Sequence, residues 1–400
     1  MIHSRRQFLR NLSAVTAAVP LGVLAATQDD QAPDADANLR AQIEAHRPAR
    51  LPSLPADFKA RVGAAHVAGK YHCTDRPFLV EGAQKLIELG TRLGKFWFDP
   101  RRVASDYPFN RQWGQPRTLV ELAETDAWQQ VFAMPFATLM LEAEAPVESA
   151  WQNNQAGSFY EDVTAAYETI TTWFYRQFRD RPVTVILQHW EGDWLLRGAG
   201  KPWNPPPADW QLKCERMQRW LTARQAGVSH ARAKAPSGAK CRVAHAAEVN
   251  RVLDMARGIP TMTDKVLPGV ELDLISYSAY DGMKDGVTLF KAIELIRKHA
   301  RTGPLFGPGA VYVGEIGIPE NEQPSRISER WDEWLGAALA AKALYVAQWQ
   351  LYCNELNPRL KPPPAVPVKR AEDVRGFWLV QPDGSLSATG NYFQSLWRRG

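Results

Sequence analysis

The chain has 400 residues, of which 45% are hydrophobic, and a formal net charge of +5 at neutral pH. Three arginines and no acidic residue lie within the first 26 residues, so removing that +3 leaves +2 for the rest of the chain. No run of lysine and arginine suits nucleic acid or an anionic lipid surface, and both classes of partner are excluded. The length after residue 60 fits one large domain with a sizeable core.

The first residues carry an export signal. Ser4–Leu9 is a twin-arginine pattern, and the apolar stretch Leu12–Ala26 follows it. That stretch is too short to span a bilayer stably, contains Pro20, and ends in adjoining alanines that offer a cleavage point. We therefore expect residues 1–26 to be removed after export by the twin-arginine translocation machinery, leaving a periplasmic or secreted protein with no stable membrane anchor. An uncleaved anchor and a cytoplasmic chain are the alternatives.

The rest of the chain divides into two segments. Residues 27–60 are rich in Asp, Ala and Pro, which predicts a linker or a segment that wraps around the domain. Over residues 61–400, strand patterns alternate with helix patterns, and eight such units predict a single α/β domain, a (β/α)8 TIM barrel with a C-terminal extension. The strands are expected at Ala64–Gly69, Leu93–Phe98, Ala137–Glu142, Val183–Trp190, Arg242–Ala247, Leu272–Tyr277, Val311–Ile316 and Tyr345–Gln350.

Helix signals fill the segments between these strands. Thr74 and Asp75 are expected to cap the first helix, with Pro77 near its first turn. Ser158 and Glu161 form a capping box at the start of the third helix. Further helices are expected over residues 118–132, 210–226, 287–299 and 328–344, with a last helix near the end of the chain.

Two glutamates end predicted strands at the rim where TIM barrels carry their sites. Glu191 follows the fourth strand and Glu315 ends the seventh. Because side chains alternate along a strand, we expect each glutamate to continue an inward-facing apolar row. These rows are Val183, Val185, Leu187, His189 and Glu191 on one strand, and Val311, Val313 and Glu315 on the other. A carboxylate in such a place needs a partner or a chemical task.

Two opposed carboxyl groups are what the cleavage of a glycosidic bond requires. One donates a proton to the leaving oxygen, and the other attacks the anomeric carbon or activates water. Aromatic surroundings such as Trp190 and Trp194 favour the protonated form of one of them. We expect a separation of about 5–5.5 Å, the spacing of retaining enzymes. For each glutamate taken alone, a structural ion pair is the alternative.

At this point the chain resembles a known group. Glutamates at the ends of the fourth and seventh strands are the signature of the clan A retaining glycoside hydrolases, and the resemblance covers about residues 61–352. Gly314–Gly317, with the sequence GEIG, is similar to the nucleophile strand of that clan. The resemblance implies that Glu315 is the nucleophile and Glu191 the general acid/base. No individual family within the clan is assigned.

The same resemblance suggests further substrate contacts. Trp349 on the eighth strand is placed like the aromatic platform under the sugar, and either Tyr277 or Tyr280 is placed like the tyrosine that holds the nucleophile. The chain departs from the clan at Trp190, where an asparagine normally precedes the acid/base and binds a sugar hydroxyl. Candidates for the missing polar contact are His189, His245 and Asn250.

Other residues on the early strands are candidates for lining the site. Lys95 and Trp97 on the second strand are expected to reach it, and His66 and Glu248 on the first and fifth strands are expected to line it. The fifteen tryptophans suit carbohydrate, because an indole offers a flat apolar face and one N–H donor. Core packing is the alternative. Glu142 and Glu144 are interpreted as salt-bridged structural acids.

Two rival functions remain open. A barrel that binds an oligo- or polysaccharide without cleaving it is suggested by the missing asparagine. A metal-dependent barrel hydrolase would need a histidine pair near the first strand, which His66 and His72 do not form. No cofactor or metal is therefore expected. The cysteines show no CxxC spacing and are interpreted as buried free thiols, with a bond between Cys73 and Cys353 as the alternative.

Overall fold

The computed structural model describes residues 35–153, 157–198 and 203–400. The predicted export signal and residues 27–34 lie outside these ranges. Within them, eight parallel strands close a barrel in the order β1, β2, β3, β4, β5, β7, β9, β10, with the last strand paired to the first. The predicted (β/α)8 barrel is confirmed. Its strands are β1 (Val62–His66), β2 (Leu93–Phe98), β3 (Thr138–Ala143), β4 (Thr184–Gln188), β5 (Arg242–Val249), β7 (Leu274–Ser278), β9 (Val311–Ile316) and β10 (Val346–Gln348).

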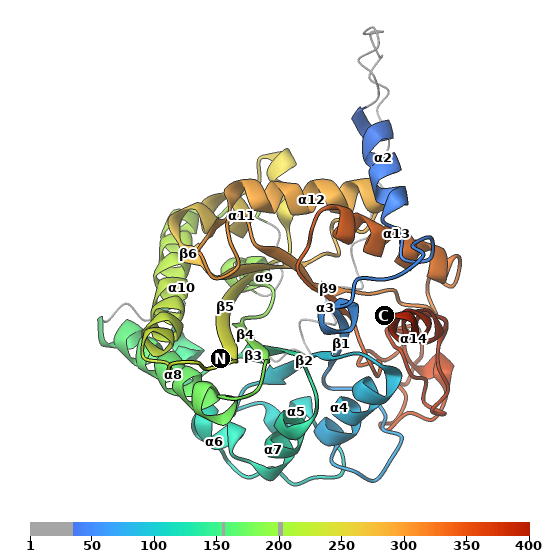
Figure 1. The fold of residues 1–400 in the computed structure, drawn as a ribbon, viewed down its shortest axis with the longest axis horizontal. Helices are drawn as coiled ribbons and strands as arrows, with labels where there is room; N and C mark the ends of the chain where they lie inside the picture. Colours follow the sequence, from blue (N-terminus) through green and yellow to red (C-terminus); the bar gives the residue numbers. More distant parts are fainter. Residues whose placement is uncertain (1–34, 154–156, 199–202) are drawn as a thin grey trace, which may run out of the picture.

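Helices surround the barrel on the outside (Figure 1). Those that follow strands are α4 (Phe78–Leu89), α5 (Val103–Asp106), α6 (Leu119–Ala123), α7 (Asp126–Ala133), α8 (Gly157–Gln177), α9 (Gly192–Arg197), α10 (Trp210–Ala233), α11 (Met262–Lys265), α12 (Gly286–His299) and α13 (Ile327–Ala340). A two-stranded sheet of β6 (Glu271–Leu272) and β8 (Arg301–Thr302) lies beside the barrel.

Three helix predictions differ in detail. The helix expected over residues 118–132 is two helices, α6 and α7, and α10 continues seven residues beyond the predicted end at 226. The first helix begins at Phe78 with Pro77 at its N-cap, rather than after Thr74 and Asp75. The reason is that the Thr74 hydroxyl donates a hydrogen bond to Glu81 at 2.8 Å instead of capping the helix.

Side chains fill the lower part of the barrel interior. A buried cluster with residues from seven of the eight barrel strands fills it, including Leu93, Met140, Ile186, Ala244, Leu274, Tyr312 and Ala347. The register joins Lys95, Met140, Ile186 and Ala244 across four strands, so these positions share the inward face. On β4 the inward row is therefore Ile186 and Gln188. The expectation that Val185 and Leu187 face inward is wrong, because they lie on the opposite face, toward the helices.

Both ends of the chain pack on the barrel wall. In the N-terminal segment, α2 (Ala35–Ala45) lies against α12 and α13, and α3 (Phe58–Arg61) leads into β1. At the other end, α14 (Ala388–Arg399) packs on α13, and the Trp397 indole donates to the Val62 carbonyl at 2.9 Å. No helix formed by the described residues has both the length and the apolarity to cross a membrane.

The four cysteines all lie in the described part of the chain and are free thiols. Cys214, Cys241 and Cys353 are buried, whereas Cys73 is exposed. The interpretation as buried thiols therefore holds for three of them and is wrong for Cys73, because the turn before α4 leaves its side chain open to solvent.

Candidate active site

A buried lysine occupies the centre of the barrel mouth. The Lys95 ammonium lies 2.8 Å from Glu142 Oε1, 3.2 Å from Glu248 Oε2 and 3.5 Å from Glu315 Oε2. It also donates to the Gly314 carbonyl at 3.0 Å. Burial acts to lower the pKa of Lys95, but its interactions with the surrounding glutamates outweigh burial and hold that pKa above its ordinary value. Lys95 is therefore a permanent positive charge beneath the site.

A polar network fixes the orientation of this cluster. The Tyr312 hydroxyl donates to Gln188 Oε1 at 2.5 Å, so the Gln188 amide nitrogen faces the other way. That nitrogen donates to Glu142 Oε1 at 3.0 Å and to Glu248 Oε2 at 2.9 Å. The Ser276 hydroxyl donates to the same Glu248 oxygen at 2.7 Å. Because these groups are buried, a change in any one of them leaves another without its partner.

An extra residue in β9 turns Glu315 into the site. Tyr277 pairs with Val313 and Ser278 with Glu315, so Gly314 has no counterpart on β7. On the other side of β9, Val346 of β10 pairs with Val313 and Gln348 pairs with Ile316, so β10 also has one residue fewer than β9 over this stretch. Strict alternation would place Glu315 on the outer face of β9 with Val311 and Val313. The prediction that Val311 and Val313 face the barrel axis is therefore wrong. The bulge re-aims Glu315 toward Lys95, as bulges beside functional sites commonly do.

The bulge requires glycine at position 314. A Cβ atom there would lie 1.9 Å from Ser276 Oγ and 2.8 Å from Glu248 Oε2. We expect Gly314→Ala to lower the free energy of unfolding by about 1–3 kcal/mol, because the buried network has to move. Denaturant unfolding measures this, with Gly114→Ala as the control, since nothing lies within 4 Å of the added atom there. Equal stability of the two variants would contradict the close approach.

Glu191 reaches the site through the turn that follows β4. Its backbone has φ 27° and ψ 73°, a conformation that side-chain-bearing residues rarely adopt. Its N–H donates to Glu248 Oε1 at 3.0 Å, and Ser278 donates to its Oε1 at 2.9 Å. Asp193 holds the turn from below, accepting backbone N–H groups of Asn250, Arg251 and Met262. The turn, and not the predicted inward row of β4, brings Glu191 to the rim.

Glu191 and Glu315 meet around Ser278 and Tyr280. Ser278 is the register partner of Glu315 and its hydroxyl contacts Glu191. Tyr280 is 37% exposed at the rim, and partial burial together with its interactions with Glu315 and Glu191 raises the pKa of its hydroxyl above the ordinary value. Tyr280 therefore stays protonated beside Glu315. Tyr277 lies on the opposite face of β7 and donates to Asp281 at 2.6 Å, so Tyr280 is the one of the two at the site.

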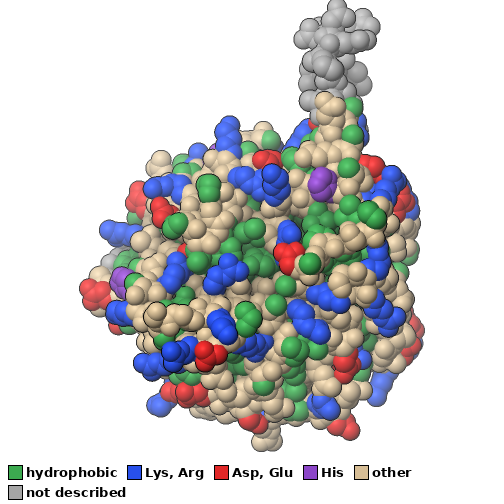
Figure 2. Space-filling view, viewed as in Figure 1, with side chains coloured by type: hydrophobic (Ala, Val, Ile, Leu, Met, Phe, Trp, Pro, Cys, Tyr) green, Lys and Arg blue, Asp and Glu red, His purple; other side chains and the backbone are tan. Residues whose placement is uncertain are grey.

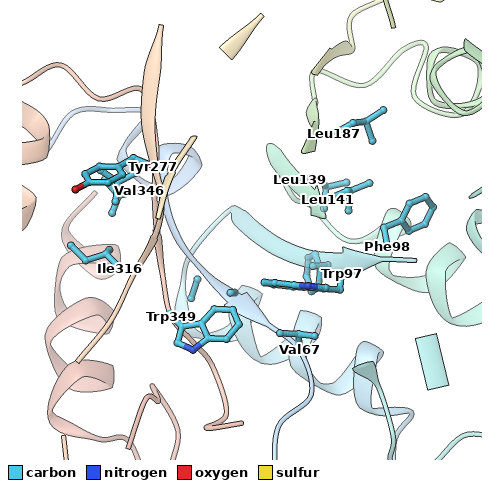
Figure 3. Close-up of a cluster of buried hydrophobic side chains, with 14 of the residues drawn as sticks. Val67, Trp97, Phe98, Leu139, Leu141, Leu187, Tyr277, Ile316, Val346 and Trp349 are labelled. Carbon is cyan, nitrogen blue, oxygen red and sulfur yellow. The ribbon is translucent and has the colours of Figure 1, made fainter. Parts of the chain in front are cut away.

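Two tryptophans line the mouth beside Lys95. The rings of Trp97 and Trp349 lie edge to face (Figure 3), with centroids 5.4 Å apart. The Lys95 ammonium lies 5.2 Å from the centroid of the Trp97 ring. Both rings are almost fully buried. Trp190 is partly exposed and packs against the core. Phe377, from the C-terminal extension, lies edge to face with Tyr280, with the two ring centroids 6.4 Å apart.

The histidines expected at the site lie behind the barrel wall. The His66 Nε2–H donates to the Phe78 carbonyl on α4 at 2.8 Å, and burial lowers the pKa of His66 to about 4. His245 faces the Tyr167 ring on α8, and burial lowers its pKa well below the ordinary value. His189 packs on Trp220 of α10. His66 and His245 point outward from their strands, and His189, which follows β4, packs toward α10, so the structure places none of the three histidines in the site.

Asn250 also has a structural task. Its Oδ1 accepts the Asp193 N–H at 3.0 Å, and its own N–H donates to Asp193. It therefore fixes the turn that carries Glu191, and its role as a substrate contact stays a prediction. Conversely, the sequence reasoning missed Gln188, Ser276 and Ser278. A polar residue inside an otherwise apolar strand was the available signal, since such groups are rarely buried without partners.

Away from the mouth, the surface is mixed in character. On the face shown in Figure 2, basic and acidic side chains are interspersed, with hydrophobic side chains between them near the centre of the view. A groove of about 860 Å³ runs between α8 and α10, lined by residues such as Tyr160, Glu161 and Arg219. It lies on the outer helices, remote from the barrel mouth. In the described ranges, no group of three histidine, cysteine or acidic side chains is arranged to hold a metal ion.

Comparison with known proteins identifies the fold. No protein-family model matches the chain, and no curated protein matches it either. Among solved structures, the chain is similar to a family 1 β-glucosidase from Thermotoga maritima, with TM-score 0.52 and 10% identity over 88% of this chain and 99% of that one. At this identity the similarity establishes a shared (β/α)8 barrel fold and nothing finer.

Two further solved structures are similar at lower scores. One is the exo-β-1,4-mannosidase Op5Man5 from Opitutaceae bacterium strain TAV5, with 16% identity and TM-score 0.48 over 84% of this chain. The match spans only 59% of the mannosidase chain. The other is the family 53 catalytic domain from Ignisphaera aggregans, with 15% identity and TM-score 0.46 over 86% of this chain and 98% of that one.

Proposed function

We propose that this chain is an exported glycoside hydrolase that acts on an oligo- or polysaccharide by a retaining double displacement. The observation that carries the proposal is the meeting of Glu191 and Glu315 at the C-terminal rim of the barrel, around Ser278 and Tyr280. Two carboxyl groups at one rim, in surroundings rich in tryptophan, are the arrangement that glycoside cleavage needs. The twin-arginine pattern at Ser4–Leu9 supports export.

The chemistry takes two steps. Glu315 attacks the anomeric carbon while Glu191 donates its proton to the departing oxygen, which leaves a glycosyl ester on Glu315. Glu191, now ionised, removes a proton from water as that water attacks the same carbon and frees Glu315. A second sugar hydroxyl in place of water would give transglycosylation. Tyr280 and Lys95 hold Glu315 ionised and oriented.

The test is hydrolysis of a panel of aryl glycosides and oligosaccharides by the protein without residues 1–26. We expect turnover of at least one substrate, and none above background for a variant with both Glu191→Gln and Glu315→Gln. Proton NMR of the first product should show the anomer of the substrate, because two displacements retain the configuration. The opposite anomer would disprove the double displacement. Turnover that survives both substitutions would disprove the site.

A second candidate is a barrel that binds sugar without cleaving it, and the observation that favours it is Trp190. The residue before Glu191 carries an indole where the clan has an asparagine, so one sugar hydroxyl contact is missing. Calorimetric binding of an oligosaccharide that the protein does not cleave, over the whole panel, would favour this candidate over hydrolysis.

A further inference from the structure

The cluster around Lys95 contains more negative than positive groups. One ammonium lies within 3.5 Å of three carboxyl groups, those of Glu142, Glu248 and Glu315. The lysine side chain is fully buried, and those of the three glutamates are 2%, 0% and 6% exposed. If all three were ionised, two negative charges would remain uncompensated at a buried site, which is strongly unfavourable.

The hydrogen bonds show which carboxyl group is ionised. Glu248 Oε1 accepts the Glu191 N–H, and Glu248 Oε2 accepts from Lys95, Gln188 and Ser276. Every group around it is a donor, so a proton on Glu248 would have no acceptor to face. Glu248 is therefore the carboxylate that joins the Glu191 turn to Lys95.

Glu142 differs from Glu248 in its second oxygen. Glu142 Oε1 accepts from Lys95 at 2.8 Å and from Gln188 at 3.0 Å. Its Oε2 is buried and has no hydrogen-bond partner among the described residues. If Glu142 were ionised, a charged oxygen would be buried there without a donor. If Glu142 is protonated, the group without a partner is a neutral hydroxyl, which costs less to bury than a charge.

We propose that the cluster holds one resident proton on Oε2 of Glu142, so that Glu142 is a neutral positioning residue and Lys95 serves Glu248 and Glu315 alone. The proton follows from the buried charge count and the hydrogen-bond pattern, independently of any activity. Its consequence for catalysis rests on the proposed function. Without this proton, a further negative charge would stand beside Glu315 and compete with it for Lys95.

The charged groups around Glu142, and the pKa that they and burial give it, support a proton on Glu142. The titratable or charged groups that face Glu142 are Lys95 on β2, Glu248 on β5, and Tyr312 and Glu315 on β9. Burial is the largest cause that raises the pKa of Glu142, to about 8, and Lys95 opposes it only in part. The folded protein then binds more protons than the unfolded chain between pH 4.5 and about 8, so its stability falls as the pH rises through that window.

Infrared spectroscopy tests the proton directly. We expect a protonated-carboxyl band in the parent at about pH 7 that is lost as the pH rises through about 8, and that is absent from Glu142→Gln over the same pH range. Burial also raises the pKa of Asp281, to about 6, and that of Glu148. Asp281→Asn is therefore the control and should keep the band. Absence of the band from the parent, or its survival in Glu142→Gln, would overturn the proposal.

The pH dependence of the hydrolysis rate gives a second test, in which Glu142→Gln and Glu248→Gln are expected to behave differently. Ionisation of Glu191 lowers both rates at alkaline pH, but between about pH 6 and about pH 9 the parent should lose at least about threefold more in rate than Glu142→Gln, because the amide has no proton to lose. Glu248→Gln should be impaired by at least about tenfold at both pH values, because its amide N–H₂ faces donors. An equal alkaline loss in parent and Glu142→Gln would overturn the proposal.

The two tests separate the two hypotheses. A protein that hydrolyses no glycoside but shows the band would disprove the proposed function and leave the resident proton standing. Should Glu142→Gln fail to fold, labelling the parent with ¹³C-glutamate removes Asp281 from the labelled spectrum and leaves Glu148 as the other buried glutamate with a raised pKa. A labelled parent without a titrating band between about pH 7 and about pH 9 would overturn the proposal.

Discussion

Glu315→Gln is expected to lower kcat by at least about 10³-fold on every glycoside that the parent hydrolyses. The amide has nearly the same shape as the carboxylate but cannot form the glycosyl ester, so the first displacement has no nucleophile. The β9 bulge that aims position 315 toward Lys95 is a property of the backbone and of Gly314, and it should remain. The loss should therefore appear in kcat, whereas KM should change little.

Steady-state kinetics on the best substrate of the panel measures this loss. Denaturant unfolding should show that the variant is folded, since Lys95 keeps its contacts with Glu142, Glu248 and the Gly314 carbonyl. Glu355→Gln is a suitable control: Glu355 pairs with Arg375 at 2.7 Å and contributes to the charge near Tyr280, but it does not contact Lys95. A Glu315→Gln variant as active as Glu355→Gln would exclude Glu315 as nucleophile.

The fold was predictable from the sequence because it depends on repetition. Each strand of a parallel barrel is buried on both faces and each is followed by a helix, so eight apolar runs separated by helix patterns define the order of elements. The burial of both faces also explains why the inward-facing row of β4 was predicted incorrectly. On β4 both the row of Val185 and Leu187 and the row of Ile186 are apolar, so alternation alone does not show which row faces the axis.

The position of the two glutamates was predictable for a different reason. Each stands at the C-terminal end of a strand, where a side chain reaches the rim by a local backbone irregularity even when the row behind it faces outward. The bulge at Gly314 and the left-handed turn at Glu191 are such irregularities, and neither has a sequence signature that fixes its geometry. The histidine assignments failed because they relied on the row alone.

The support beneath the glutamates was not predictable as a unit. Lys95, Gln188 and Glu248 come from β2, β4 and β5, and only the barrel register brings them within hydrogen-bond distance. Sequence spacing carries no record of that register. What it does carry is the anomaly of charged and amide side chains inside apolar strands, which in a closed barrel indicates a mutually satisfied polar cluster.

The second large effect concerns Glu191, and the size of the loss depends on the leaving group. Glu191→Gln should lower kcat/KM by about 10²–10⁴-fold for a substrate whose leaving group is a sugar or a weakly acidic phenol, because that oxygen departs only with a proton. For a strongly acidic phenol the loss in kcat/KM should be less than about tenfold, since its anion leaves unaided. Stopped-flow and steady-state kinetics with a series of aryl glycosides measure this dependence.

The same substitution also removes the base of the second step, which makes the glycosyl ester on Glu315 long-lived. With an acidic phenol we therefore expect a burst of phenolate close to one equivalent of enzyme, followed by slow turnover. Azide needs no base, so it should restore turnover and yield the glycosyl azide. A loss that is equal for all leaving groups, with no burst and no response to azide, would show that Glu191 only supports the turn in which Asp193 and Glu248 hold it.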